Sequence, residues 1–250
     1  MFHPTTEQRL QERARPAGQP AMYQRWAELL FLHWAVEPAD IQRTLPEGLT
    51  VDVFQGRAWI GLVPFFMQRV RPRFCPAVPV LSDFLEVNVR TYVHDALGRP
   101  GVWFYSLDCN QWLAVKLARR FFHLPYEHAR QQAVKAADGW LDYRSERIGA
   151  GPVSHFRYRA AATHTVAEPG TLKFFLVERY RLYAYDARAD RLWTGRVAHA
   201  PYEIAAAEVS DCDGRLLQAA GFAVGNKAPE HICAARAVAV DIFPLERVRS

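Results

Sequence analysis

Residues 84–95, FLEVNVRTYVHD, alternate between apolar and polar side chains over the length of a β-strand. Alternation of this kind places every second side chain on the same face of the strand. One face therefore carries Glu86, Asn88, Arg90, Tyr92 and His94, and the residues between them form an apolar face. In an open sheet the polar face would meet water. In a closed sheet it would line a polar lumen, where buried charges need partners.

Other segments predict more strands and a single long helix. The helix is expected from Gln111 to about Phe122, with Asn110 as its cap and Pro125 at its end. A short helix starts at Pro38, and a hairpin is expected around Gln55 and Gly56. Further strands are expected at 29–36, 127–137, 139–148, 153–164, 175–186, 191–199 and 202–210. This pattern predicts an α+β protein, mainly antiparallel β, with a large curled or closed sheet. We expect an N-terminal arm over residues 1–21 and a single domain over 22–250.

Composition excludes several classes of protein. The formal charge of +5 comes from arginines scattered among acidic residues, so no nucleic-acid partner is expected. The four cysteines are widely spaced, which favours free thiols in a reducing cytoplasm. The N-terminus lacks the apolar stretch of a secretion signal. The longest apolar run, 59–67, is far shorter than the ~20 residues that span a membrane, so no membrane partner is expected.

Common cofactor and nucleophile motifs are absent from the sequence. There is no glycine-rich dinucleotide or phosphate loop, no zinc-protease helix and no hydrolase nucleophile elbow. The histidines are scattered singly, so no metal site is expected.

A second polar segment, FLVERYRLYAYD, is expected to be a strand. One face would then carry Glu178, Tyr180 and Leu182, and the other would carry Arg179, Arg181, Tyr183 and Tyr185. The arginine-rich face could clamp a carboxylate. It could equally be an edge strand whose arginines reach into solvent.

Five long stretches resemble one bacterial family. They are LLFLHWAVEPADIQRTLPEGLTVDVFQGRAWIGLVPF, FLEVNVRTYV, SLDCNQWLAVKLARRFFHLPYEHA, GTLKFFLVERYRLY and GRVAHAPYEI. Together they resemble the YqjF-like proteins, a family of unknown function in the acetoacetate-decarboxylase-like superfamily. The resemblance covers about residues 22–245. It implies a closed, cone-like, antiparallel barrel whose interior forms the site.

The resemblance to acetoacetate decarboxylase itself can be followed residue by residue. Arg119 and Pro125 match that enzyme's arginine and proline at the same spacing, and Phe84-Leu85-Glu86 is similar to its barrel glutamate motif. The enzyme's second glutamate falls near Gly61 and Leu62, and Arg25 is the nearest match to its N-terminal arginine.

The enzyme's two adjacent lysines fall on Tyr126 and Glu127. One of those lysines forms an imine with the ketoacid, and its partner lowers its pKa. Neither a tyrosine nor a glutamate can form an imine. Lys116 and Lys173 are not obvious substitutes, so imine-based decarboxylation is disfavoured.

The first functional hypothesis is an enzyme acting on a small organic acid or carbonyl compound, with no cofactor and no imine. Tyr126 would be a general acid, and Glu86 or Glu127 a base whose pKa is raised by burial. Arg90 or Arg179 would hold a carboxylate. Further predicted ligand-binding residues are Asn88, Arg119 and Glu178. The expected partner is a small-molecule carboxylate, and a homo-oligomer is allowed.

Two alternatives stay open. In one, the barrel binds a small anionic or aromatic ligand without converting it. In the other, the polar residues only satisfy one another inside a filled barrel, and the protein is part of an assembly. A cavity near Tyr126 separates the last hypothesis from the first two.

Overall fold

The computed structural model describes residues 3–149, 151–224 and 227–248. Within these residues the chain forms seventeen strands and five helices. The helices are α1 (Thr6–Gln11), α2 (Pro38–Gln42), α3 (Trp112–Phe121), α4 (Leu172–Val177) and α5 (Arg215–Ala219). The strands are β1 (Met22–Ala27), β2 (Leu29–Val36), β3 (Leu49–Val51), β4 (Ala58–Pro72), β5 (Phe84–Asp95), β6 (Pro100–Cys109), β7 (Tyr126–Lys135), β8 (Leu141–Arg147), β9 (Val153–Ala160), β10 (Thr165–Val166), β11 (Arg181–Asp186), β12 (Arg191–Ala198), β13 (Glu203–Ala205), β14 (Ala207–Cys212), β15 (His231–Ala235), β16 (Val238–Ile242) and β17 (Glu246–Arg247).

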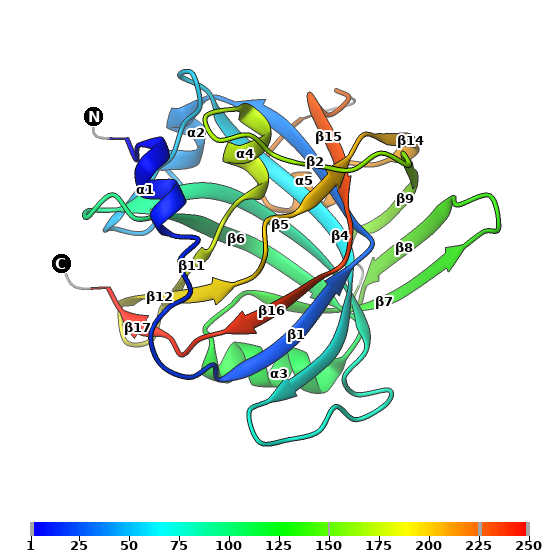
Figure 1. Ribbon diagram of the computed structural model, residues 1–250, viewed down its shortest axis with the longest axis horizontal. Coiled ribbons are helices and arrows are strands. Elements are labelled where there is room, and N and C mark those ends of the chain that lie inside the picture. The colour runs from blue at the N-terminus through cyan, green and yellow to red at the C-terminus, as the bar shows by residue number, and fades with distance from the viewer. Residues whose placement is uncertain (1–2, 150, 225–226, 249–250) are drawn as a thin grey trace.

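The strands close into a barrel (Figure 1). The ring runs β1, β4, β5, β6, β11, β12, β16 and back to β1, and only the β6–β11 pair in it is parallel. Gly101 makes the β6–β11 contact possible, because a Cβ there would lie 2.7 Å from the Tyr183 ring. The predicted mainly antiparallel closed barrel, with one main helix, is confirmed.

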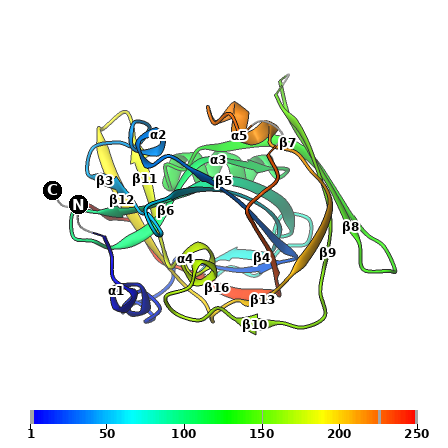
Figure 2. The same ribbon diagram turned by 90° about the horizontal axis from the view of Figure 1, so that it is seen from above.

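A second sheet explains why β5 is buried on both faces. Strands β7, β8, β9 and β14 extend from β6 and stand to one side of the ring (Figure 2). Side chains such as Val87 and Val89 pack against this sheet and β2. The alternate side chains of β5 point into the barrel, with Tyr92 in the barrel core. The period-2 pattern of 84–95 therefore separates two cores rather than a core from solvent.

The predicted strand over 175–186 is wrong in its first half. Thr171 caps a helix there by accepting a hydrogen bond from the Phe174 amide at 3.3 Å, and four residues of α4 are buried. The run of apolar side chains fills the barrel end as a helix, because tertiary packing overrides a pattern that reads equally as a strand. Glu178 ends this helix, so the predicted shared strand face of Glu178, Tyr180 and Leu182 does not form.

Within the predicted arm, residues 6–11 form a capped helix, α1, whose Arg9 is buried in the body. Two smaller predictions also need correction. Strand β3 pairs with β5 rather than forming a hairpin with β4, since only Phe54 and Arg57 bridge the turn. Gln111 is the cap of α3, and the Asn110 side chain instead accepts a hydrogen bond from the Leu85 amide at 2.8 Å.

The helices of the described residues are all too short or too polar to cross a membrane.

Candidate functional site

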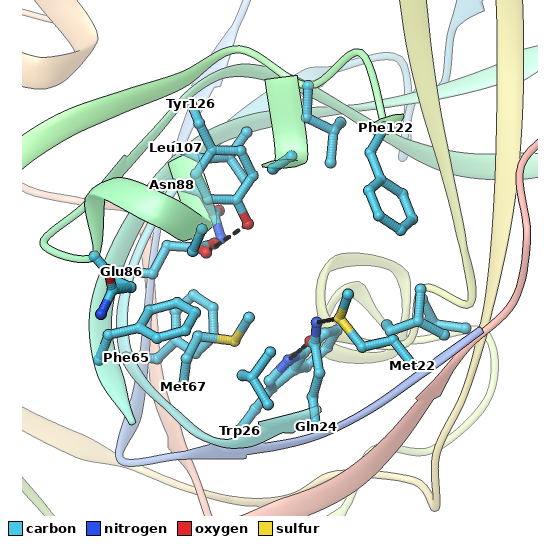
Figure 3. A pocket seen from close by; sticks show the side chains of 18 of the residues that line it. Met22, Gln24, Trp26, Phe65, Met67, Glu86, Asn88, Leu107, Phe122 and Tyr126 are labelled. Carbon is cyan, nitrogen blue, oxygen red and sulfur yellow. Dashed lines mark hydrogen bonds between the residues drawn. The ribbon is translucent and has the colours of Figure 1, made fainter. Parts of the chain in front are cut away.

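A cavity of about 390 Å³ lies inside the barrel. Its wall is mostly apolar, with side chains from β1, β4, β5, β6, β11 and α3. In Figure 3, Met22, Trp26, Phe65, Met67 and Phe122 surround the space, while Glu86, Asn88 and Tyr126 lie together on one side of it. The prediction of a polar lumen is therefore correct only for the wall formed by β5. The other strands supply mainly apolar side chains to the cavity. The cavity also argues against the hypothesis of a filled barrel.

Glu86 and Tyr126 meet in this cavity. Glu86 is on β5, and Tyr126 is the first residue of β7, which α3 brings back parallel to β6. The Tyr126 hydroxyl donates a 2.8 Å hydrogen bond to Glu86 Oε2 (Figure 3). Both side chains are buried, and Asn88 also hydrogen-bonds the Glu86 carboxylate.

The environment of Glu86 sets its charge. Burial raises the pKa of Glu86, the hydrogen bonds from Tyr126 and Asn88 lower it, and the nearby charge of Asp108 raises it, with a net pKa of about 7. Burial and the Glu86 charge raise the pKa of Tyr126 well above its ordinary value. At neutral pH the pair therefore exchanges between carboxylate and carboxylic acid while the phenol keeps its proton.

Cys109 lies beside this pair and was not singled out from the sequence. It ends β6, is fully buried, and is paired in register with Glu86. Burial, followed by the Glu86 charge, raises the pKa of the Cys109 thiol to about 12. A thiol is a nucleophile only as the thiolate, so this one stays inert at neutral pH.

Arg90 lines the same cavity without a carboxylate partner. Its Nη2 donates to the carbonyl oxygen of Leu176 at 3.2 Å and to the Tyr92 hydroxyl at 3.4 Å, while Nε has no hydrogen-bond partner. No described acidic residue forms an ion pair with it. The guanidinium lies 5.2 Å from the centre of the Phe31 ring. A buried, uncompensated guanidinium facing a cavity is suited to bind an anion.

A histidine pair holds this arrangement. Tyr92 donates to the Leu176 carbonyl at 2.8 Å, so it accepts from His33 Nε2 at 2.7 Å. His33 Nδ1 then accepts from His231 Nδ1 at 3.0 Å, an assignment that follows from the network. Burial, then the charges of His231 and Arg90, lowers the pKa of His33 well below its ordinary value, so it stays neutral.

Gly61 makes room for these side chains. Gly61 is on β4, directly opposite Arg90 of β5. A Cβ on Gly61 would be 3.0 Å from His33 Cδ2 and 3.5 Å from Arg90 Cγ. Gly61 is one of the two residues near which the resemblance placed the decarboxylase's second glutamate, and a side chain at Gly61 would crowd His33.

Arg179 also lines the cavity, but it already has a partner. Its Nη1 donates to Asp52 at 2.8 Å, and Arg9 donates to the two Asp52 oxygens at 2.6 and 2.7 Å. Burial, then the charge of Arg9, lowers the pKa of Arg179 to about 10. Arg181, expected on the same arginine-rich face, also lines the cavity and is likewise paired, with Glu12 at 3.0 Å.

Three predicted site residues lie away from the cavity. Glu127 follows Tyr126 on β7 and so points the opposite way; it pairs with Arg119 at 2.8 Å near the surface. Glu178 is buried elsewhere, accepting from the Tyr202 amide at 3.0 Å and from the Tyr180 hydroxyl. The structure therefore brings together Glu86, Asn88, Arg90, Tyr126 and Arg179 only.

No lysine lines the cavity among the described residues. Lys116 lies over the Trp112 ring at 4.6 Å, and Lys135 pairs with Glu28 at 2.7 Å. Lys173 and Lys227 are exposed. In the described part of the chain, no three His, Cys, Asp or Glu residues are arranged to hold a metal ion.

Comparison with known sequences matches the chain to one family over most of its length. The DUF2071 family, described as an uncharacterised conserved protein, matches residues 23–239. The uncharacterised protein YqjF of Bacillus subtilis is 35% identical over 215 residues, which cover 86% of this chain and 87% of that protein.

Solved structures with the same fold are acetoacetate-decarboxylase-like. The enduracididine biosynthesis enzyme MppR, complexed with pyruvate, superposes with a TM-score of 0.61 at 14% identity, over 92% of this chain and 91% of that chain. An acetoacetate decarboxylase-like enzyme from Sphingomonas wittichii gives 0.61 at 14% identity, over 93% and 94%. The acetoacetate decarboxylase of Legionella pneumophila gives 0.61 at 10% identity, over 96% and 94%. At these identities the likeness concerns the fold alone.

Proposed function

This chain belongs to the DUF2071 family of uncharacterised conserved proteins, and we propose that its barrel is an enzyme that transfers a proton on a carbonyl-containing organic acid without forming an imine. The observation that carries the proposal is the 2.8 Å hydrogen bond between Tyr126 and Glu86 inside an apolar cavity. A carboxyl group with a pKa of about 7 is suited to accept and return a proton at neutral pH.

The pair can move a proton in either direction. In the carboxylate form, Glu86 accepts a hydrogen bond from Tyr126 and has its other oxygen available as a base. In the acid form, Glu86 donates to the phenol oxygen, and the Tyr126 hydroxyl turns toward the ligand. A phenol donating to a carbonyl oxygen stabilises the negative charge that develops there when a neighbouring carbon loses its proton.

Arg90 supplies the second contact that such a ligand needs. Glu86 and Arg90 are four residues apart on β5, so their Cα atoms are separated by roughly 13 Å along the strand. Apolar side chains, including Leu29 and Val63, line the same cavity. We therefore assign the ligand a carboxylate at Arg90, a carbonyl at the Glu86–Tyr126 pair and an apolar body.

The lysine positions support chemistry that differs from that of acetoacetate decarboxylase. An imine requires a neutral amine within reach of the carbonyl carbon. By the sequence resemblance, Tyr126 and Glu127 correspond to the decarboxylase's two lysines. None of the chain's four lysines lines the cavity in the described structure. The proposed proton transfer needs only groups that the cavity contains.

Ligand binding without turnover is the second candidate. It is favoured by one observation, the uncompensated charge of Arg90 beside an apolar wall, because these two features suffice to hold a hydrophobic carboxylate. The two functions differ in whether the ligand's acidic C–H protons exchange with solvent.

The test is deuterium exchange, followed by proton NMR in D₂O, into aliphatic oxo acids in which a chain of increasing length separates the carbonyl from the carboxylate, because Glu86 and Arg90 are roughly 13 Å apart along β5. We expect Glu86→Gln to slow catalysed exchange about 100-fold or more, since general base catalysis contributes that much. Glu127→Gln, the same change one residue beyond Tyr126 but outside the cavity, should leave the rate within about twofold. If these acids raise the melting temperature of the protein but exchange no protons, the enzyme hypothesis is wrong and ligand binding without turnover is supported. Exchange that survives Glu86→Gln would remove Glu86 from the mechanism.

A further inference from the structure

A large apolar surface surrounds the mouth of the cavity. Four large apolar residues both line the cavity and are more than a third exposed, which places the mouth between α3 and the loop over residues 73–83. These residues are Val78, Leu81, Leu113 and Leu117. The two segments lie together at the bottom of Figure 1, and Gln111 Nε2 joins them by donating to the Val80 carbonyl oxygen at 3.3 Å.

The two most exposed large apolar side chains of the described structure, Phe74 and Val80, belong to this surface. Phe74 is 88% exposed, Val80 81%, Phe121 61% and Trp112 52%. Exposed apolar side chains gathered on two neighbouring segments are costly to leave in water and are typical of a binding surface. We call this set, Phe74, Val78, Val80, Leu81, Trp112, Leu113, Leu117 and Phe121, the mouth patch.

The charge around the mouth patch is strongly positive. Residues 69–83 and 111–123 contain six arginines and lysines but only one acidic residue, Asp83. The whole chain carries a formal charge of only +5, so these two segments hold its positive excess.

Five of these six cations have no carboxylate partner among the described residues; only Arg119 is paired. They are Arg69, Arg71, Arg73, Lys116 and Arg120. Several lie on aromatic rings instead, as Arg73 does on Phe74 at 4.4 Å and Lys116 on Trp112 at 4.6 Å.

From these observations we propose that the mouth patch docks on the surface of an anionic phospholipid bilayer. Exposed aromatic and aliphatic side chains among unpaired cations are the combination that inserts shallowly into lipid while binding its headgroups. A second copy of this chain is a poorer partner, because a two-fold contact would place the unpaired cations against one another. Docking of this kind needs no membrane-spanning segment, so the short apolar runs of the sequence do not exclude it.

The docking surface opens directly into the barrel. An apolar molecule leaving the bilayer would pass Leu113 and Leu117 and reach the apolar wall without crossing water. This route fits a hydrophobic ligand, but the proposal rests on the patch and its charge and does not depend on catalysis at Glu86.

The test is co-sedimentation of the full chain with vesicles of phosphatidylglycerol and phosphatidylcholine, against phosphatidylcholine alone. We expect binding to the anionic vesicles that falls with added salt, and little binding to the neutral ones. Lys116→Glu should weaken it about tenfold or more, because reversing a charge removes one attraction and adds one repulsion. Lys173→Glu, the same change on the exposed start of α4, should have little effect.

A second set of variants tests how much the apolar side chains of the mouth patch contribute to vesicle binding. Phe74→Ser with Phe121→Ser should weaken vesicle binding at least tenfold, whereas Val134→Ser, at a site 67% exposed on β7, should not. Absence of binding to anionic vesicles, or equal binding by every variant, would overturn the proposal. A dimer in solution that dissociates in the phenylalanine variant would assign the patch to a second copy instead. Retention of single-stranded oligonucleotides with no vesicle binding would assign it to nucleic acid.

Discussion

The Tyr126 hydroxyl lies 2.8 Å from a carboxylate oxygen of Glu86, although forty residues separate them in the chain. Two strands and the crossover helix α3 produce this contact, and the apolar cavity around it gives Glu86 a pKa of about 7. Arg90 lines the same cavity, no lysine lines it among the described residues, and buried ion pairs of Asp52 hold the N-terminal helix.

Ionisation of Glu86 should lower the free energy of unfolding as pH rises. Its folded pKa of about 7 exceeds the ordinary value of 4.5, so between these values the native state holds a proton that the unfolded state has lost. Stability from this group is present below pH 4.5 and is lost as pH passes through 7. Urea denaturation should therefore show Glu86→Gln gaining roughly 2–3 kcal/mol relative to wild type between pH 5 and pH 8. A difference that does not change with pH would contradict the burial of an ionisable Glu86.

Borohydride should trap no adduct on this protein. Incubation with 2-oxo and 3-oxo acids followed by reduction should leave the intact mass unchanged, because the described cavity wall contains no lysine amine. A lysine-dependent acetoacetate decarboxylase treated in parallel should gain the mass of the reduced adduct. An adduct mapped to any of the four lysines of this chain would show that the protein does form an imine, contrary to the prediction.

Arg90→Leu should discriminate between charged and neutral ligands. A hydrogen-bonded charge contributes about 1.5–3 kcal/mol, so affinity for an apolar oxo acid should fall about 10- to 100-fold in calorimetry. Affinity for its methyl ester should change little. Arg130→Leu, which removes an exposed arginine paired with Glu146 at 3.5 Å, is the control. Equal losses for acid and ester would show that Arg90 shapes the cavity rather than binding the carboxylate.

Of the two carboxylates Asp52 and Glu203, Asp52 should have the larger effect on the free energy of unfolding when it is replaced. Burial raises its pKa, but the charges of Arg179 and Arg9 outweigh burial and hold it below the ordinary value. Asp52→Asn leaves two buried arginines without their counter-charge and should cost about 3–5 kcal/mol in chemical denaturation. Glu203→Gln breaks the exposed pair with Arg236 and should cost less than about 1 kcal/mol. Similar costs for the two variants would contradict the assigned role of burial.

Part of this structure follows from local sequence pattern. The alternation of 84–95 correctly assigned Glu86, Asn88 and Arg90 to one face, because a strand has a fixed period of two. The same rule places Tyr126 and Glu127 on opposite faces of β7, so both could not belong to one cavity. Applying it at 126–127 would have removed Glu127 from the predicted site.

Other features depend on contacts between distant segments. The residues of α4 fit a strand or a helix equally well, and packing inside the barrel end decides between them. Closure through the parallel β6–β11 pair joins residues about eighty positions apart, which no local pattern encodes. The apolar wall opposite β5 and the ion pair of Arg9 with Asp52 arise only after that closure.

The most direct test of the account is the titration of Glu86 itself, followed by NMR of protein carrying ¹³C at glutamate side-chain carboxyls. We predict one signal with a midpoint near pH 7 that disappears in Glu86→Gln. In Tyr126→Phe the midpoint should rise, because the hydrogen bond from that tyrosine lowers the pKa of Glu86. A Glu86 midpoint near the ordinary 4.5 would contradict the proposal that this pair exchanges a proton at neutral pH.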